Sequence, residues 1–242
     1  MTRAPDETGT LDRILTLEIA RVTERAAVAA AHLRGRGDEK AADQAAVDAM
    51  RSELNTLAIE GVIVIGEGER DEAPMLFIGE QVGTGEGPSV DVALDPLEGR
   101  TVCAKNLPNS LAVIAMTGRG SLLNAPDVYM EKIAVGPGYP EGVVDLAQPP
   151  EVNLQALARA KGVAVSEITA CILDRQRHAP LIEAVREAGA AIRLLGDGDI
   201  AGVIHTTDPE QTGIDIYMGI GGAPEGVLAA AALRCTGGQI QG

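Results

Sequence analysis

The spacing of apolar residues divides the chain into a helical beginning followed by short strands. Apolar positions recur at helical intervals over residues 11–33, and a second helix is predicted over 40–57. Short apolar runs at 62–65, 90–94 and 111–116 predict three strands. We therefore expect an N-terminal α+β region in which helices precede a small sheet.

The later part of the chain has a different pattern. Residues 117–138 are punctuated like loops with one short helix, whereas helices and strands alternate beyond Pro149–Pro150. The predicted helices cover 153–161, 180–188, 200–205 and 227–234, and the predicted strands cover 169–173, 192–195 and 214–220. Such alternation predicts βαβ units around a sheet that is buried on both faces. The two prolines therefore mark a predicted boundary between subdomains 1–150 and 151–242.

Composition limits the partners that the protein can have. The 242 residues carry a net charge of -15 and include no Trp, one Phe and three Tyr. Nucleic-acid binding favours a basic groove with aromatic rings, and an anionic membrane surface attracts basic segments. We therefore expect neither nucleic acid nor a membrane as a partner. An anionic substrate needs a local cation in so acidic a protein, and a divalent metal ion is the simplest candidate.

The predicted lack of targeting signals and the pattern of cysteines indicate a cytoplasmic protein. No apolar run is long enough for a transmembrane helix, and the polar N-terminus predicts no signal peptide. The three cysteines, Cys103, Cys171 and Cys235, are odd in number and far apart. We expect them to be reduced thiols rather than disulfide partners or zinc ligands.

Two acidic clusters directly follow predicted strands. In Gly66–Glu72, two carboxylates lie one residue apart between glycines and can approach a small hard cation; the alternative is an ordinary acidic hairpin loop. In Asp95–Gly99, Pro96 predicts a turn that directs Asp95 and Glu98 toward one metal position. We favour metal binding over a plain turn for this second cluster.

Two further acidic positions are candidates. Gly219–Gly226 joins a strand to a helix, and its glycines can offer N–H donors to an oxyanion, although their spacing does not match a dinucleotide fingerprint. Glu225 in this segment either binds a metal or complements the helix dipole. Asp43 lies among alanines on a helix, where a buried carboxylate is costly unless it is paired or bound to metal, and where an exposed one has no special meaning.

The basic candidates follow later strands. In Asp174–His178, Arg175 and Arg177 form a compact positive patch that matches phosphate oxygens, or they are surface ion-pair partners. Asp197–Asp199 follows the next strand and either binds sugar hydroxyls or caps the helix that begins there. Carboxylates in three clusters and guanidinium groups in one are what metal-dependent phosphoryl transfer requires.

The order of these motifs resembles class II fructose-1,6-bisphosphatases, the bacterial type that in cyanobacteria also acts on sedoheptulose 1,7-bisphosphate. The resemblance covers nearly the whole chain. Its matching segments are Ala41–Asp43, Ile63–Glu69, Asp71–Leu76, Asp95–Gly99, Ala125–Met130, Arg175–His178, Asp197–Asp199 and Gly219–Gly226. It implies an α/β protein of two subdomains with the layered α/β/α/β/α fold of the lithium-sensitive sugar phosphatases.

The resemblance also implies a site and a reaction. The ligands of Mg²⁺ or Mn²⁺ would be Asp43, Glu67, Asp95, Glu98 and Glu225, and the catalytic residues would be Glu67, Asp95 and Thr101. Substrate contacts would fall on Glu98, Gly99, Arg100, Tyr129, Arg175, Gln176, Arg177, Asp197, Gly198, Asp199 and Gly222. The implied reaction is in-line attack of a metal-activated water on the 1-phosphate, in gluconeogenesis or the Calvin cycle. Family members are cytoplasmic homo-oligomers, so a dimer or tetramer is expected.

Two departures from the family pattern keep other functions open. The family has Thr after Asp-Pro-x-Glu-Gly, whereas this chain has Arg100 followed by Thr101; on an extended backbone this displacement turns the hydroxyl to the other side. The chain also stops soon after Gly219–Gly226, so we expect it to lack the family's C-terminal part. The alternatives are an inositol-phosphate or other sugar-phosphate phosphatase, and a non-catalytic sensor that binds a phosphosugar.

Overall fold

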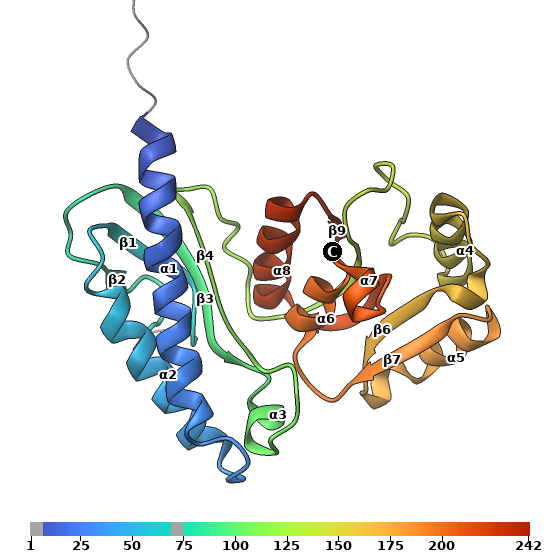
Figure 1. Ribbon diagram of the computed structural model, residues 1–242, viewed down its shortest axis with the longest axis horizontal. Helices are drawn as coiled ribbons and strands as arrows, with labels where there is room; N and C mark the ends of the chain where they lie inside the picture. Colours follow the sequence, from blue (N-terminus) through green and yellow to red (C-terminus); the bar gives the residue numbers. More distant parts are fainter. Residues whose placement is uncertain (1–6, 69–74) are drawn as a thin grey trace, which may run out of the picture. The chain divides into compact units, whose positions relative to one another are not determined.

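The protein has two compact units, each built around its own sheet (Figure 1). The computed structural model describes residues 7–68 and 75–242. The first unit contains the chain up to Asn106 together with Ala112–Leu122, and the second contains Leu107–Leu111 and Leu123–Gly242. The predicted mixed α/β class is confirmed in both units.

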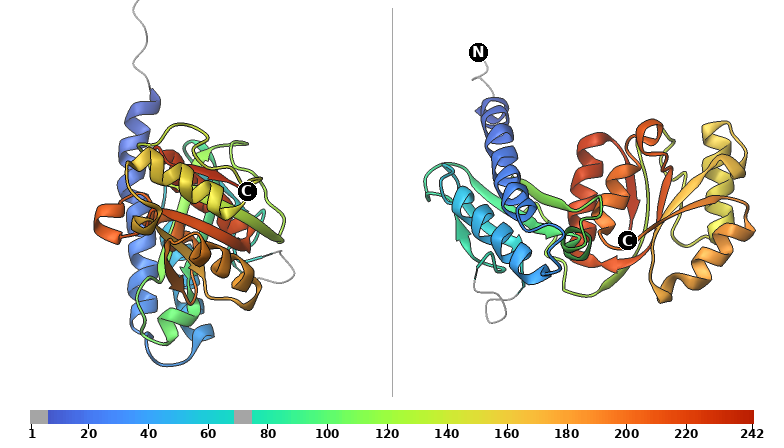
Figure 2. Two further views of the ribbon diagram at one scale, coloured as in Figure 1. Left: turned by 90° about the vertical axis from the view of Figure 1, so that its right-hand side faces the viewer. Right: turned by 60° about the horizontal axis from the view of Figure 1, so that its bottom comes forward.

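The first unit consists of two helices that cover one face of a four-stranded sheet (Figures 1 and 2). Its elements are α1 (Glu7–Ala31), α2 (Glu39–Leu54), β1 (Glu60–Ile65), β2 (Gln81–Val82), β3 (Ser89–Glu98), the short helix α3 (Arg100–Ala104) and β4 (Leu111–Gly118), with strand order β2-β1-β3-β4. Alanines such as Ala26 and Ala46 are fully buried where α1 and α2 meet the core. Small side chains at these positions let the helices approach closely.

Strand β3 is longer than the sequence predicts. We expected a strand to end at Leu94 and to turn at Pro96, but β3 continues to Glu98 with Pro96 inside it. Its parallel pairing with β1 ends at Ala93, which lies opposite Ile65. A proline beyond that point takes no hydrogen bond away from the ladder between β3 and β1.

The second unit contains a five-stranded sheet of order β7-β6-β8-β5-β9. Its strands are β5 (Tyr129–Val135), β6 (Thr169–Leu173), β7 (Ala191–Leu195), β8 (Ile216–Gly222) and β9 (Gln239–Gln241). Strand β6 runs parallel to both β7 and β8, whereas β5 is antiparallel to β8 and β9. The central parallel strands and their connecting helices confirm the predicted βαβ units.

Helices cover both faces of this second sheet (Figures 1 and 2). Helices α4 (Pro150–Lys161) and α5 (Ala179–Glu187) pack on one face, and α6 (Asp199–His205) and α8 (Ala223–Thr236) pack on the other; the remaining elements are η1 (Val165–Glu167), η2 (Gln176–His178) and α7 (Pro209–Thr212). Neighbouring residues of β6 point to opposite faces. Ile172 packs in the hydrophobic core on the α4 and α5 side, and Cys171 packs in the core on the α6 and α8 side. This alternation is the two-residue period of a strand with both faces buried.

The division between units differs from the predicted boundary at residue 150. Residues 117–138, which we expected to be loops with a short helix, contain strand β5. This strand pairs with β8 along its whole length, from Tyr129 opposite Gly222 to Val135 opposite Ile216, and therefore belongs to the second unit. Pro149 and Pro150 instead mark the beginning of α4, where a proline at the first helical position fits the backbone.

Across residues 7–68 and 75–242, no helix combines the length and the apolar character needed to cross a bilayer.

Candidate active site

Asp43 and Glu67 lie together in the first unit, joined by Arg100. Asp43 is on α2 and Glu67 follows β1, and their side chains are only 16% and 12% exposed. The Nε atom of Arg100 lies 2.9 Å from Asp43 Oδ1, and its Nη2 atom donates a hydrogen bond of 3.0 Å to Glu67 Oε2. Asp43 is thus the buried, paired carboxylate that the sequence left open, and its partner is a side chain from the Asp-Pro-Leu-Glu-Gly-Arg segment.

The electrostatic surroundings of these two carboxylates favour a bound cation. Burial raises the pKa of Asp43, and the positive charge of Arg100 partly offsets this increase. Burial also raises the pKa of Glu67, the negative charge of Asp43 raises it further, and Arg100 lowers it. Asp43 Oδ1 is buried and accepts no hydrogen bond, despite its short distance to the Arg100 guanidinium. A buried carboxylate oxygen of this kind suits a small hard cation.

Asp95 and Glu98 are both on β3, and Glu98 is buried. Asp95 Oδ1 accepts a hydrogen bond of 3.0 Å from the backbone N–H of Leu97. The expectation that the two side chains face one metal position relied on a turn at Pro96, which the strand does not contain. On a regular strand, residues three apart lie on opposite faces. Their convergence on a metal ion therefore stays a prediction.

Within the described residues, no three His, Cys, Asp or Glu side chains are grouped so as to hold a metal ion in this conformation. The acidic residues Glu69, Asp71 and Glu72 of the first cluster lie outside the described residues. In the part of the site that the structure describes, the cation between Asp43 and Glu67 is a guanidinium group.

Thr101 is in a different backbone conformation from the one expected. Gly99 has the left-handed φ of 81° that ends the strand, and Arg100 and Thr101 then form the first turn of α3. Our expectation of an extended backbone here was wrong. On a helix, successive side chains are rotated by about 100° rather than 180°. The side chain of Thr101 therefore points away from that of Arg100 by a smaller angle than it would on a strand.

In the second unit, Asp199 is paired with a lysine that sequence reasoning missed. The ammonium group of Lys132 on β5 is fully buried and donates hydrogen bonds to Asp199 Oδ2 and, at 2.8 Å, to the carbonyl oxygen of Gly222. Asp199 is the first residue of α6, and Gly198 precedes it at the N-cap. The one available signal was a lysine placed inside the otherwise apolar end of a strand.

Glu225 lies in the first turn of α8, directly beside this pair. Burial raises the pKa of Glu225, while Lys132 lowers it. Glu225 Oε2 is buried and has no hydrogen-bond partner. A Cβ atom added at Gly222 would lie 1.8 Å from Glu225 Oε2, and one added at Gly221 would lie 2.0 Å from Asp199 Oδ2. The two glycines are therefore required for these carboxylates to lie against the backbone of β8.

The predicted arginine patch is divided between two places. Arg175 donates to Asp197 Oδ1 at 3.1 Å and to the carbonyl oxygen of Gly196, at the end of β7. Arg177 donates two hydrogen bonds, of 3.1 and 2.8 Å, to the carbonyl oxygen of Ile220 on β8. Its guanidinium group also lies 4.9 Å from the centre of the Tyr129 ring. Of the two arginines, Arg177 is therefore the one placed beside the exposed tyrosine.

Two remaining candidates in this unit, Gln176 and Gly198, lie just after the C-terminal ends of strands β6 and β7. Gln176 begins η2 between the two arginines. Gly198, with a φ of 88°, precedes Asp199 at the N-terminus of α6. Both positions follow the C-terminal ends of parallel strands, which is where α/β sheets usually bind ligands.

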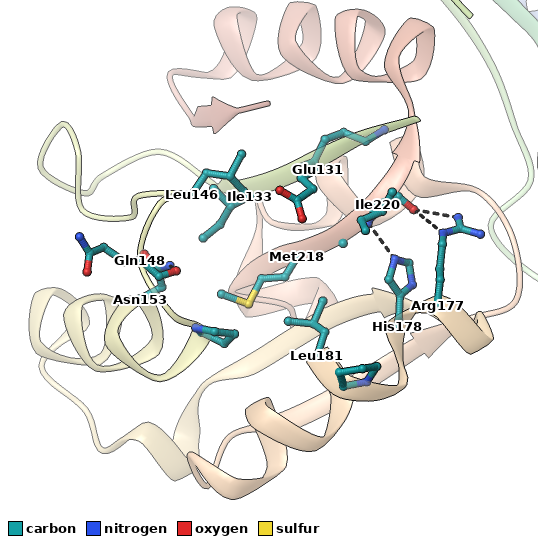
Figure 3. Close-up of a pocket in the computed structure, with 14 residues that line it drawn as sticks. Glu131, Ile133, Leu146, Gln148, Asn153, Arg177, His178, Leu181, Met218 and Ile220 are labelled. Atoms are coloured by element: carbon teal, nitrogen blue, oxygen red, sulfur yellow. Dashed lines mark hydrogen bonds between the residues drawn. The ribbon is translucent and has the colours of Figure 1, made fainter. Parts of the chain in front are cut away.

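A cavity of about 300 Å³ opens on the α4 and α5 side of the sheet (Figure 3). Arg177 and His178 lie at one end of it, and Glu131, Gln148 and Met218 are among its other lining residues. Both ring nitrogens of His178 make hydrogen bonds within the protein. Its Nε2 accepts a 2.8 Å hydrogen bond from the N–H of Ile220. Its Nδ1 must therefore carry the proton that bonds the carbonyl oxygen of Leu173.

Comparison with known proteins identifies the family. Residues 13–242 match the profile of bacterial fructose-1,6-bisphosphatases, glpX-encoded. The chain is 49% identical over 232 residues to the D-fructose 1,6-bisphosphatase class 2/sedoheptulose 1,7-bisphosphatase of Prochlorococcus marinus strain NATL1A. It is 50% identical to the proteins of the same name from strains MIT 9303 and MIT 9313. Each match covers 96% of this chain and 69% of the relative.

Among solved structures, an extragenic suppressor from Pyrococcus furiosus aligns with 91% of this chain and 83% of that protein at 12% identity. Its TM-score of 0.45 is too low to establish a common fold. The sequence matches, by contrast, extend over nearly the whole chain. The chain therefore belongs to the family of bacterial, glpX-encoded fructose-1,6-bisphosphatases.

Proposed function

We propose that the chain hydrolyses the 1-phosphate of fructose 1,6-bisphosphate and also accepts sedoheptulose 1,7-bisphosphate. The observation that carries this proposal is the family match over residues 13–242, together with relatives of about half identity whose names include both activities. In the reaction, the oxygen of water bonds to phosphorus and the bond from phosphorus to the sugar oxygen breaks. The sugar oxygen takes up a proton, so the products are inorganic phosphate and a sugar monophosphate.

The family is metal-dependent, and we propose Mg²⁺ or Mn²⁺ as the ion. The proposed ligands are Asp43, Glu67, Asp95, Glu98 and Glu225. The donor chemistry fits, because all five are carboxylates and the buried oxygen Glu225 Oε2 accepts no hydrogen bond. When bound, such an ion supplies positive charge to the phosphate oxygens and makes a water molecule more acidic.

The chain's own side chains would bind and orient the sugar bisphosphate. Glu67 and Asp95 are the proposed catalytic carboxylates, and Thr101 is the proposed hydroxyl that orients water. In the second unit, Tyr129 and Arg177 form a face that suits a sugar ring and a second phosphate, because a guanidinium fork binds phosphate oxygens. Asp199, held by Lys132, is a proposed acceptor for sugar hydroxyls.

The other proposed substrate contacts belong to the same strand ends. They are Glu98, Gly99, Arg100, Arg175, Gln176, Asp197, Gly198 and Gly222. Among them, Arg100 binds Asp43 and Glu67, and Arg175 binds Asp197. For these residues, substrate binding requires an exchange of partners.

A non-catalytic phosphosugar sensor is the second candidate, and one observation favours it. The guanidinium of Arg100 lies against two of the proposed metal ligands. A protein that kept this arrangement would bind the sugar phosphate through its second unit without hydrolysing it.

Phosphate release from a small substrate panel separates the candidates. The panel contains fructose 1,6-bisphosphate, sedoheptulose 1,7-bisphosphate, fructose 6-phosphate and inositol 1-phosphate, each with Mg²⁺, with Mn²⁺ and with chelator. We expect release from the two bisphosphates only, and only with metal. Release mainly from inositol 1-phosphate would indicate the other phosphatase class. Calorimetric binding of a bisphosphate without release would indicate the sensor.

Two further properties belong to the proposal. We propose a cytoplasmic location, which suits the three free thiols Cys103, Cys171 and Cys235. We also propose a homo-oligomer, dimer or tetramer. Light scattering at assay concentration measures its mass directly.

A further inference from the structure

The ion pairs of Arg100 place a cation between two largely buried carboxylates. Its Nε atom is 2.9 Å from Asp43 Oδ1 and its Nη2 atom is 3.0 Å from Glu67 Oε2, so the two ends of one guanidinium contact two different acids. These acids come from separate elements, α2 and the segment after β1. Arg100 itself begins α3 after the left-handed residue Gly99.

The side chains of Asp43, Glu67 and Arg100 differ in how easily they can move out of this ion pair into solvent. The Asp43 and Glu67 side chains are 16% and 12% exposed, whereas the Arg100 side chain is 47% exposed. Two carboxylates that lie close together away from water repel each other unless a cation compensates them. The Arg100 side chain is already about half exposed, so its guanidinium can turn toward solvent more easily than either carboxylate.

We infer that Arg100 is a built-in counter-ion that competes with the divalent metal for Asp43 and Glu67. This inference rests on the proposed function, in which both carboxylates are metal ligands. The atoms Asp43 Oδ1 and Glu67 Oε2 cannot contact the guanidinium and a metal ion from the same side at once. Metal binding through them therefore displaces Arg100, and the free protein keeps its two acids neutralised until the metal concentration is sufficient.

Calorimetric titration of Mn²⁺ into the metal-free full chain tests this competition. Arg100→Met removes the charge and keeps much of the side-chain volume, and we expect it to bind Mn²⁺ about tenfold more tightly than the parent, a change of about 1.4 kcal/mol. Arg100→Lys keeps the charge but cannot contact both acids with a planar fork, so its affinity should lie between the two.

Arg119→Met is the matched control. Arg119 also belongs to the first unit, its side chain is 41% exposed, and it pairs with the buried carboxylate of Asp91. This variant also loses one positive charge, but beside Asp91, which is not a proposed metal ligand. We therefore expect its Mn²⁺ affinity to stay within about twofold of the parent. An increase equal to that of Arg100→Met would show a general effect of net charge and would overturn the inference.

Thermal unfolding gives a readout that is independent of turnover. Without metal, Arg100→Met should unfold at a lower temperature than the parent, because two neighbouring acids lose their counter-ion. Saturating Mn²⁺ should reduce or remove this difference. If Arg100→Met does not fold, the Arg100→Lys titration alone still decides the inference.

The outcomes separate this inference from the proposed function. Equal Mn²⁺ affinity in the parent and in the folded Arg100 variants overturns the competition, while metal-dependent phosphate release by the parent leaves the proposed function standing. Binding of no Mn²⁺ by any of the proteins overturns both. Tighter binding by the Arg100 variants, with Arg119→Met unchanged, is the result that the inference predicts.

Discussion

The ammonium group of Lys132 is buried against the carboxylate of Asp199, and it also donates a 2.8 Å hydrogen bond to the carbonyl oxygen of Gly222. Both partners of this ion pair are buried, with exposed side-chain fractions of 0% and 5%. The lysine thus joins β5, α6 and the end of β8 at one point.

Replacement of this lysine should destabilise the protein strongly. Lys132→Met leaves the Asp199 carboxylate buried without a counter-charge, and we expect the free energy of unfolding in urea to fall by about 3–5 kcal/mol. Lys161→Met is the control, because Lys161 pairs with the buried Asp215 but is itself 33% exposed. Its loss should be clearly smaller. An equal fall in the free energy of unfolding in the two variants would show that the deeper burial of the Lys132 pair adds nothing to its effect on stability.

Arg177 should bind the phosphate that is not hydrolysed. Arg177→Met removes the guanidinium beside Tyr129, and we expect KM for fructose 1,6-bisphosphate to rise about tenfold or more with little change in kcat. Arg159→Met, which removes an exposed arginine from α4, should leave KM unchanged. Steady-state kinetics of the two variants measures this difference. A loss confined to kcat would place Arg177 at the reacting phosphate instead.

Gly222 should be required for metal binding rather than for folding. An added Cβ would lie 1.8 Å from Glu225 Oε2, so Gly222→Ala must displace the end of that flexible side chain. We expect the free energy of unfolding to change by less than about 1 kcal/mol while Mn²⁺-dependent phosphate release is lost. Gly196→Ala is the control, since its added Cβ meets no atom within 4 Å. Full activity of Gly222→Ala would remove Glu225 from the site.

The thiol of Cys171 should make stability depend on alkaline pH. Burial raises the pKa of Cys171 from its ordinary value of 9.0 to about 12, against a smaller opposing effect of Arg193. The folded state then keeps a proton that the unfolded chain loses, so stability is full below pH 9.0 and falls as pH rises toward 12.

Comparison with Cys171→Ala isolates this contribution. Between pH 9.0 and 12, the parent should lose up to about 1.4 kcal/mol more per pH unit than the variant. Urea unfolding at pH 8 and at pH 10 measures the two slopes. Parallel slopes would mean that the folded protein already exposes this thiol.

The sequence predicted those elements whose pattern is local. Strand β6 was expected over Thr169–Leu173 and has those bounds, because a short apolar run between helices is unambiguous. Strand β5 was missed, since its pairing partner β8 lies about ninety residues later and nothing local indicates it. The end of β3 was misplaced for a related reason: Pro96 indicates a turn, and only the folded chain shows that the pairing of β3 with β1 has ended before it.

Prediction of the site was limited in the same way. The motifs named Asp43 and Glu67 separately, but only the folded chain shows that the two acids share Arg100. The sequence treated Arg175 and Arg177 as one patch because they are two residues apart, whereas their hydrogen bonds go to different strand ends. Lys132 was missed because a buried charge is stable only through a partner that tertiary structure supplies.

The most direct test of the account is phosphate release from fructose 1,6-bisphosphate by Glu67→Gln, measured with Mn²⁺ beside the parent chain. The variant keeps the size of the side chain and removes the charge that we assign to metal binding. We predict metal-dependent release by the parent and none by a Glu67→Gln protein whose unfolding transition is unchanged. Near-normal turnover by the variant would contradict the assignment of Glu67 and, with it, the proposed site.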